Sequence, residues 1–349
     1  MHSGGIKMKK AVTIKEIAEQ LHMSRNTVSK ALNGQYVPEK TRQLVLDKAR
    51  QLNYKCLNNS WRAQSTRHFR FILLAGKPLN NMPYYVPLIK SIENLCFENN
   101  CDLFQYVYNK SRTPFKGVSD YISELNVDGI IAIECFDRDF ISRLLGLDKP
   151  ICFIDFAHLK GNIGGNFDII CANDRQSVEG AVAQIIKKYG LSRFTFVGDN
   201  LHCMSFRERY LGMIDALFRY NVRHSKAEDI LANDDTFNYG DVNAIKTKIL
   251  QLRYRSECFV CCNDFVARVV CNALKELGIR IPEETLVLGF DNVREAHYPN
   301  PTITTFSVDK EFIGKEALRA LVNRIETPDI PTRIIHISTV SVAGKTTLR

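Results

Sequence analysis

The sequence predicts a multidomain chain: an all-α module of three short N-terminal helices, followed by an α/β body of two lobes with parallel sheets. Two observations indicate this. Helix start and stop signals recur at short intervals through residues 13–52. Residues 67–349 then alternate strand-sized apolar runs with helical runs, which is typical of parallel sheets covered by helices. Since these 283 residues are too many for one such sheet, we expect two lobes.

The first two helices are predicted to be joined by a tight turn. Thr13 and Glu16 have the spacing of a capping box, in which each side chain accepts the other residue's backbone N–H. They predict a helix over residues 14–21. Ser24 is suited to cap a second helix, and Asn33-Gly34 to end it. This spacing is that of a helix-turn-helix.

A third helix is expected to complete the module. Pro38 suits a first helical turn, because its missing N–H needs no partner there. The helix would run to about Leu52 and place four apolar side chains inside, namely Leu44, Val45, Ala49 and Leu52.

The exposed side of the second helix carries hydrogen-bond donors and no acid: Arg25, Asn26, Thr27, Ser29 and Lys30. Arg and Lys hydrogen-bond guanine edges, Asn hydrogen-bonds adenine, and Ser and Thr contact phosphate. Residues 1–66 also hold twelve Lys or Arg against four Asp or Glu, so most of the chain's net charge of +9 lies there. The pattern favours DNA binding. The alternative is a plain three-helix bundle with a solvated basic surface.

Residues 12–34 resemble the DNA-binding headpiece of the lac repressor/gal repressor family. The string Ser-x-x-Thr-Val-Ser-x-x-Leu-Asn-Gly over residues 24–34 is specific to that family, and residues 37–42 extend the match. The resemblance implies that Arg25 and Asn26 contact bases, with Lys30 also toward the groove. It implies phosphate contacts for four hydroxyl side chains, those of Thr13, Ser24, Thr27 and Ser29.

The linker departs from the family pattern. Family members carry an x-Pro and then a short hinge helix, whose leucine enters the minor groove. Here Cys56 replaces the proline and Ala63 the leucine, and alanine is too small to unstack a base step. Trp61 could substitute in a shifted register or pack against protein. Arg62 could still contact phosphate. Whether this segment forms a helix and kinks DNA stays open.

The body is predicted to contain repeated βαβ units. Strands are expected over residues 69–75, 103–108, 128–133, 151–154, 194–197, 258–261 and 285–290. Helices are expected near 86–99, 118–125, 177–188, 210–218, 242–251 and 267–277. Ligands bind such folds between the lobes, at the carboxyl ends of the strands.

The body resembles the family's periplasmic-binding-protein-like (type I) effector domain, through residues 127–131, 205–212, 262–264, 287–291 and 301–305. The resemblance implies a headpiece over 11–56, a linker over 57–67 and an effector-binding and dimerisation domain over 68–349. The N-terminal lobe would hold about 68–165 and 307–337, and the C-terminal lobe about 166–306 and 338–349.

By position, the resemblance places effector contacts on Asp155, Arg209, Asn263 and Asp291. Such a set of donors and acceptors suits a polyhydroxylated ligand such as a sugar. An aromatic platform would complete a sugar site. The aromatic candidates are Phe237, Tyr84 and Tyr85, each with ordinary packing as the alternative. Lys77, with Asn80 and Asn81, follows the first strand and indicates either an acidic or phosphorylated ligand or a solvated loop.

Other classes of protein lack support. No apolar run approaches the roughly 18 residues of a membrane span, and no signal peptide is visible. The 11 cysteines are scattered through apolar segments, which favours the reducing cytoplasm. Cys258 and Cys261 lack a second pair of metal ligands, and His202-Cys203 lacks an orienting acid. We therefore expect no metal, cofactor or enzymatic activity.

The sequence thus predicts a cytoplasmic transcriptional regulator, a repressor, that binds a pseudo-palindromic operator in double-stranded DNA as a homodimer and responds to a small sugar-like effector. No leucine heptad follows Ser338, so a dimer rather than a tetramer is expected. One alternative is a ligand-binding protein with weakened specific DNA binding that acts through a protein partner. Another is an enzyme acting on a sugar-like substrate.

Overall fold

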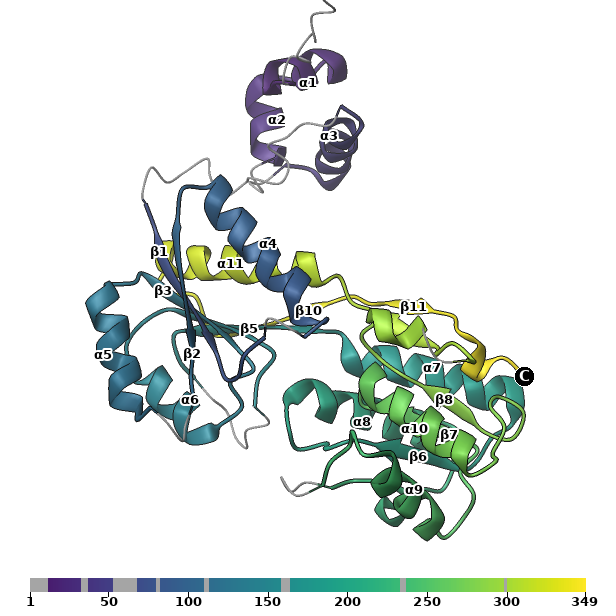
Figure 1. The fold of residues 1–349 in the computed structure, drawn as a ribbon. Helices are drawn as coiled ribbons and strands as arrows, with labels where there is room; N and C mark the ends of the chain where they lie inside the picture. Colours follow the sequence, from purple (N-terminus) through teal and green to yellow (C-terminus); the bar gives the residue numbers. More distant parts are fainter. Residues whose placement is uncertain are drawn as a thin grey trace, which may run out of the picture. The chain divides into compact units, whose positions relative to one another are not determined.

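The chain forms two compact units, residues 1–68 and 69–349, in a computed structural model (Figure 1). The structure describes residues 12–32, 37–52, 68–79, 82–109, 113–157, 164–232, 237–297 and 300–349. The predictions for Cys56, Trp61, Arg62, Ala63, Asn80 and Asn81 lie outside these residues. Within them, every helix is too short or too polar to span a lipid bilayer.

The N-terminal unit contains the three helices that the sequence predicts, α1 (Ile14–Leu21), α2 (Arg25–Leu32) and α3 (Glu39–Gln51). The capping box is present: the Thr13 backbone N–H donates to Glu16 Oε2 at 2.7 Å, and the Glu16 N–H donates to Thr13 Oγ1 at 3.3 Å. The Thr27 backbone N–H donates to Ser24 Oγ at 3.0 Å and so caps α2. These local bonds fix where both helices begin.

The core of this unit is small and apolar: Ile17, Ala18, Val28, Ala31, Val37, Val45 and Ala49 are buried in it. The prediction for Leu44 was wrong, because its side chain is 51% exposed. Leu44 immediately precedes Val45, and one residue turns an α-helix by about 100°. With Val45 facing the core, Leu44 faces outward.

The body contains a six-stranded parallel sheet in the order β10-β5-β4-β3-β1-β2. Its strands are β1 (Arg70–Ala75), β2 (Asp102–Val107), β3 (Gly129–Ile133), β4 (Ile151–Ile154), β5 (Phe167–Ala172) and β10 (Arg333–Ile337). Helices α5 (Phe115–Leu125) and α6 (Arg138–Leu145) cover one face, and α4 (Tyr85–Glu98) and α11 (Lys310–Glu326) cover the other (Figure 1). The central strands are buried on both faces, as parallel sheets require.

The second lobe is built on a three-stranded parallel sheet, β6-β7-β8, formed by β6 (Phe194–Val197), β7 (Cys258–Cys261) and β8 (Leu286–Leu288). Its helices are α7 (Asp174–Tyr189), α8 (Met204–Arg219), α9 (Val242–Gln251) and α10 (Asp264–Glu276). Strands β9 (Thr305–Ser307) and β11 (Val340–Val342) form an antiparallel pair. Short 3-10 turns cover 226–228, 294–297 and 345–347.

The chain crosses between the lobes three times: after β5, after β9 and after β10. The first crossing was predicted at about residue 166, but β5 still belongs to the larger sheet, so the crossing follows Ala172. The chain segments at the first and third crossings contact each other, because the hydroxyls of Ser177 and Thr339 lie 2.7 Å apart.

Helices α7 and α8 pack closely because Gly212 has no side chain. A Cβ at this position would lie 2.4 Å from the carbonyl oxygen of Arg175 and 3.1 Å from the backbone nitrogen of Glu179. Backbone atoms cannot give way as a flexible side chain can. Gly212 therefore sets the distance between the two helices.

We expect Gly212→Ala to lower the free energy of unfolding by about 1–3 kcal/mol, because the helices must separate. The matched control is Gly180→Ala, also in this helix pair, where an added Cβ would meet no atom within 4 Å. That substitution should raise stability by up to about 1 kcal/mol, since alanine restricts the unfolded chain. Urea unfolding followed by circular dichroism measures both; equal effects of the two substitutions would contradict the close-packing role.

Candidate functional site

Three acidic residues lie just beyond strand ends of the body: Glu134 directly after β3, Asp155 directly after β4, and Asp291 three residues after the end of β8. Their φ angles are 55°, 59° and 103°, which are uncommon for residues with a side chain. Such conformations cost roughly 1–3 kcal/mol each and cluster at functional sites. The carboxyl ends of the strands are also where ligands bind in this architecture.

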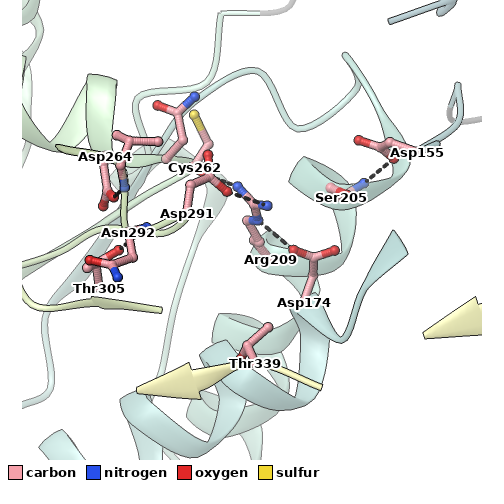
Figure 2. Close-up of polar contacts among 12 residues, drawn as sticks. Asp155, Asp174, Ser205, Arg209, Cys262, Asp264, Asp291, Asn292, Thr305 and Thr339 are labelled. Atoms are coloured by element: carbon pink, nitrogen blue, oxygen red, sulfur yellow. Dashed lines mark hydrogen bonds and ion pairs between the residues drawn. The ribbon is translucent and has the colours of Figure 1, made fainter. Parts of the chain in front are cut away.

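Arg209 lies at the centre of the site and is almost fully buried on α8. Figure 2 shows its guanidinium between two carboxylates. Nε donates to Asp174 Oδ1 at 2.7 Å, and Nη2 pairs with Asp291 Oδ1 at 3.1 Å. Nη1 donates to the Cys262 carbonyl at 2.5 Å, and the guanidinium lies 3.8 Å from the centre of the Phe290 ring. Arg209 is therefore held in one position from several sides.

The charges of this cluster depend on each other. Burial raises the pKa of Asp291 to about 6, against the lowering effect of Arg209. Burial also raises the pKa of Asp174, which Arg209 again counteracts. Although burial alone would lower the pKa of Arg209, the two carboxylates raise it well above its ordinary value. The guanidinium thus stays charged and favours the ionised form of both carboxylates.

Asp155 connects the two lobes. Its Oδ1 accepts the backbone N–H of Phe156 at 2.7 Å and that of Ser205, at the start of α8, at 3.2 Å. The Met204 N–H donates to the Phe156 carbonyl at 2.7 Å. Burial, and then the charge of Asp174, raise the pKa of Asp155 to about 6. A ligand that contacted Asp155 would therefore contact a joint between the lobes.

Lys310, which lies beside Tyr84, forms a second connection between the lobes. Lys310, the first residue of α11, donates from Nζ to the backbone carbonyl of Asp291 at 2.6 Å. The same ammonium lies 5.4 Å from the centre of the Tyr84 ring. Burial, and then the charge of Asp291, raise the pKa of Tyr84 well above its usual range. Tyr84 therefore lies among the charged groups of the site, and its role as an aromatic contact stays a prediction.

The other two predicted effector contacts are Asn263 and Phe237. Asn263 caps α10, accepting the Val266 backbone N–H on Oδ1 at 2.9 Å. The ring of Phe237 contacts that of Tyr239, 4.8 Å away, and lies 5.9 Å from Lys248 Nζ. The roles of Asn263 and Phe237 stay predictions.

Asp174 and Lys310 were not predicted from the sequence. Asp174 begins α7, and the predicted helix there started only at residue 177. Lys310 begins α11, for which no helix was predicted. The signals were present: Asp309 accepts the Phe312 backbone N–H at 2.9 Å and so caps α11. An Asp three residues before an apolar position could have revealed that helix.

In the N-terminal unit, the predicted base-contacting residues Arg25, Asn26 and Lys30 are all exposed on α2. Thr27 and Ser29 are partly buried, while Thr13 and Ser24 are exposed at the helix starts. The hydroxyls of Ser24 and Thr27 lie 2.8 Å apart. The structure therefore gathers donors along one short helix, and Arg62 lies outside the described residues.

Metal binding and nucleophilic chemistry find little support among the residues described. No group of three or more His, Cys, Asp or Glu side chains there could hold a metal ion. Burial raises the pKa of the Cys203 thiol well above its ordinary value, which disfavours the thiolate. The neighbouring His202 packs its ring against Phe136 at 4.9 Å.

Comparison with known proteins gives matches to both units. Residues 183–347 match the model of a periplasmic binding protein-like domain. The chain is 27% identical over 333 residues to the HTH-type transcriptional repressor PurR of Mannheimia succiniciproducens, covering 93% of this chain and 95% of that one. A complex of the transcriptional regulator CelR with cellobiose is similar in structure, with TM-score 0.70, 18% identity and coverage of 96% and 99%. The lac repressor dimer bound to operator and the anti-inducer ONPF has TM-score 0.66, 18% identity and coverage of 97% and 100%.

Proposed function

The chain belongs to the lac repressor family of transcriptional regulators, and from that premise we propose which residues of this repressor bind the operator and the effector. It is a DNA-binding transcriptional repressor controlled by a small molecule. The observation that carries the residue assignment is the position of Arg209, which is held between carboxylates where both lobes meet. In this proposal the effector contacts Asp155, Arg209 and Asp291, with Asn263, Tyr84 and Phe237 around it.

Control of DNA binding would follow from the connections between the lobes. The protein acts as a homodimer whose twofold symmetry matches a pseudo-palindromic operator. A ligand bound near Asp155 and Asp291 would change the contacts that these residues make across the lobes, to Ser205 and Lys310. Such coupling typically changes affinity by about 1–3 kcal/mol and acts equally in both directions.

The nature of the effector is a further proposal. The site offers carboxylate oxygens and the Arg209 guanidinium, and an aromatic ring at Tyr84. This set suits the hydroxyl groups and apolar face of a sugar or sugar derivative. Cellobiose is the ligand of the similar CelR structure. We propose a sugar-like effector for this chain, and a cytoplasmic location, which suits its many buried free cysteines.

Arg25→Ala is expected to reduce discrimination between operator and random duplex by about 1–3 kcal/mol, the value of one good base contact. Non-specific affinity should persist with its salt dependence, because other basic groups still attract phosphate. The measurement is a competition titration of operator against random duplex at fixed salt. Lys15→Ala, an exposed residue paired with Glu19 on α1, is the control and should leave discrimination unchanged. Equal discrimination by Arg25→Ala and the unaltered protein would exclude base contact by Arg25.

A DNA selection with the full-length protein on a random duplex library tests the whole proposal. An enriched twofold-symmetric site would support it, and its central step would show whether residues 57–67 kink DNA. Absence of enrichment, with the protein folded and dimeric, would favour a ligand-binding protein with weakened DNA binding that acts through a protein partner. The enzyme alternative predicts turnover of candidate sugars, which the repressor proposal does not.

A further inference from the structure

The lysine that follows β1 is already paired within the protein. Lys77 Nζ lies 2.8 Å from Glu134 Oε2, and the Tyr85 hydroxyl donates to the other carboxylate oxygen. The Glu134 side chain is only 9% exposed, whereas that of Lys77 is 42% exposed. Glu134 therefore neutralises Lys77 and is itself held by Tyr85. The sequence left two alternatives for Lys77, a contact to an acidic ligand or a solvated loop; its ion pair with Glu134 was not predicted.

Lys77, Glu134 and Tyr85 lie beside the candidate effector site. Glu134 and Lys77 follow the neighbouring parallel strands β3 and β1, and the Gly76 backbone N–H donates to the Ile133 carbonyl at 3.0 Å. Tyr85 packs edge-on against Tyr84, with ring centres 4.9 Å apart. The charges of Glu134 and Asp155 both act on the Tyr85 hydroxyl and contribute to raising its pKa, after burial. Polar side chains thus lie next to one another from Lys77, through Tyr85 and Tyr84, to the cluster around Arg209.

The other two cationic side chains described at this site also have protein partners. Arg209 contacts Asp174 and Asp291, and Lys310 donates to the Asp291 carbonyl beneath the Tyr84 ring. Against these three cations stand four carboxylates, those of Glu134, Asp155, Asp174 and Asp291. A further acid, Asp264, is also buried, and its burial and then the charge of Asp291 raise its pKa to about 7, so it is left out of this count. Among the described residues, the site therefore carries more negative than positive charge.

This excess of negative charge favours some classes of ligand over others. A phosphate or carboxylate group needs charge-assisted donors to replace its hydration, and here each of the three cationic side chains already contacts an oxygen of the protein. It would also meet carboxylates of its own sign, and like-charge contact is a common way to reject a wrong ligand. Hydroxyl and ammonium groups donate hydrogen bonds, so the carboxylates favour them.

We propose that the effector carries no negative charge, and that Glu134 is the specificity-determining residue that enforces this by occupying Lys77. The inference rests on the proposed function, because it assumes that the effector binds at this site. It narrows the effector to neutral or positively charged polyhydroxylated molecules and excludes sugar phosphates and sugar acids.

Glu134→Gln tests the role of Glu134 directly. Glutamine keeps an acceptor for the Tyr85 hydroxyl but frees the Lys77 ammonium. The probes are glucose 6-phosphate and glucose, titrated calorimetrically into full-length protein at constant ionic strength and pH 7.5. The quantity compared is the ratio of the affinity for glucose 6-phosphate to the affinity for glucose. We expect this ratio to be roughly tenfold or more higher in Glu134→Gln than in the unaltered protein. The double variant Lys77→Met/Glu134→Gln should lose that gain.

Glu124→Gln is the matched control. It removes the same charge from an exposed position near the end of α5, at the opposite end of β3 from Glu134, and should leave the preference unchanged. No gain in Glu134→Gln with an unchanged unfolding temperature would overturn the role of Glu134. If that variant does not fold, the unaltered protein decides: tighter binding of glucose 6-phosphate than of glucose would overturn the proposal. Failure of the DNA selection would sink the repressor assignment without altering these titrations.

Discussion

Replacing Arg209 with methionine is expected to abolish the response of operator binding to effector. Methionine fills similar space but removes the charge that holds Asp174 and Asp291 in place. Two buried carboxylates would then face each other without a partner. Removing one side of a buried pair costs about 3–5 kcal/mol of stability, so the free energy of unfolding should fall by this amount.

The pH dependence identifies the cause of that loss. Burial already raises the pKa of Asp291 to about 6, and Asp174 is shifted in the same direction. Without Arg209 both pKa values rise further. A carboxyl whose folded pKa is raised loses its favourable contribution as the pH rises through that value. The deficit of Arg209→Met relative to the unaltered protein should therefore be larger at pH 8 than at pH 5.

Urea unfolding at both pH values and an effector titration of operator affinity are the measurements. Arg207→Met is the control, since Arg207 lies on the same helix and contacts the Tyr210 ring at 6.0 Å. It should cost no more than about 1 kcal/mol and leave the response intact. An unchanged effector titration in Arg209→Met would remove Arg209 from the site, and equal losses at pH 5 and pH 8 would contradict the carboxylate explanation.

The sequence predicted the site residues unevenly, for physical reasons. Arg209 and Asp291 lie within short matched motifs, and the structure holds them in one cluster. Asp155 lies in no such motif and was predicted only by its position in the family resemblance. Asp174 and Glu134 carry no such motif; they reach the site because neighbouring parallel strands end at the same edge. Lys77 was visible in the sequence, but its ion pair was not. Its partner Glu134 is 57 residues away and is brought beside it only by the β1–β3 pairing.

The fold was predictable where local signals suffice. The capping box of α1 and the apolar runs of β3 and β4 are local, and all three elements form. Strands β5 and β10 were not predicted, because each contains a charged residue whose burial depends on distant partners. Asp168 in β5 is fully buried only because Arg324 and Arg333 contact it. No local pattern distinguishes such an aspartate from a surface one.

The buried ion pair between Arg324 and Asp168 gives the second prediction with a large expected effect. Arg324, on α11, is 1% exposed and donates from Nη2 to Asp168 Oδ1 at 2.6 Å and from Nε to Oδ2 at 3.0 Å. It also donates to the backbone carbonyls of Ile330 and Pro331. Asp168→Asn keeps the shape of the side chain but leaves the guanidinium buried without a counter-charge. The free energy of unfolding should fall by about 3–5 kcal/mol near neutral pH.

The pKa of Asp168 gives this prediction its own pH signature. Burial acts to raise that pKa, but the hydrogen bonds and charges of Arg333 and Arg324 outweigh it, and the pKa lies below the usual 3.8. A carboxyl with a depressed folded pKa stabilises the protein above its unfolded pKa, and that stability is lost as the pH falls through the folded value. The gap between Asp168→Asn and the unaltered protein should therefore be constant from pH 8 to pH 5 and narrow below about pH 4.

Arg333→Met separates the buried pair from the exposed one. The Arg333 side chain is 33% exposed and contacts the same carboxylate, so water can replace much of its contribution. Its loss should cost about 1 kcal/mol, because partly exposed ion pairs are weak. A cost for Arg333→Met equal to that of Asp168→Asn would mean that β10 is held by its edge contact rather than from within. We expect Asp168→Asn to cost more stability than Arg333→Met. That difference would mean that the Arg324–Asp168 pair holds β10, and the lobe crossing that follows it, in position.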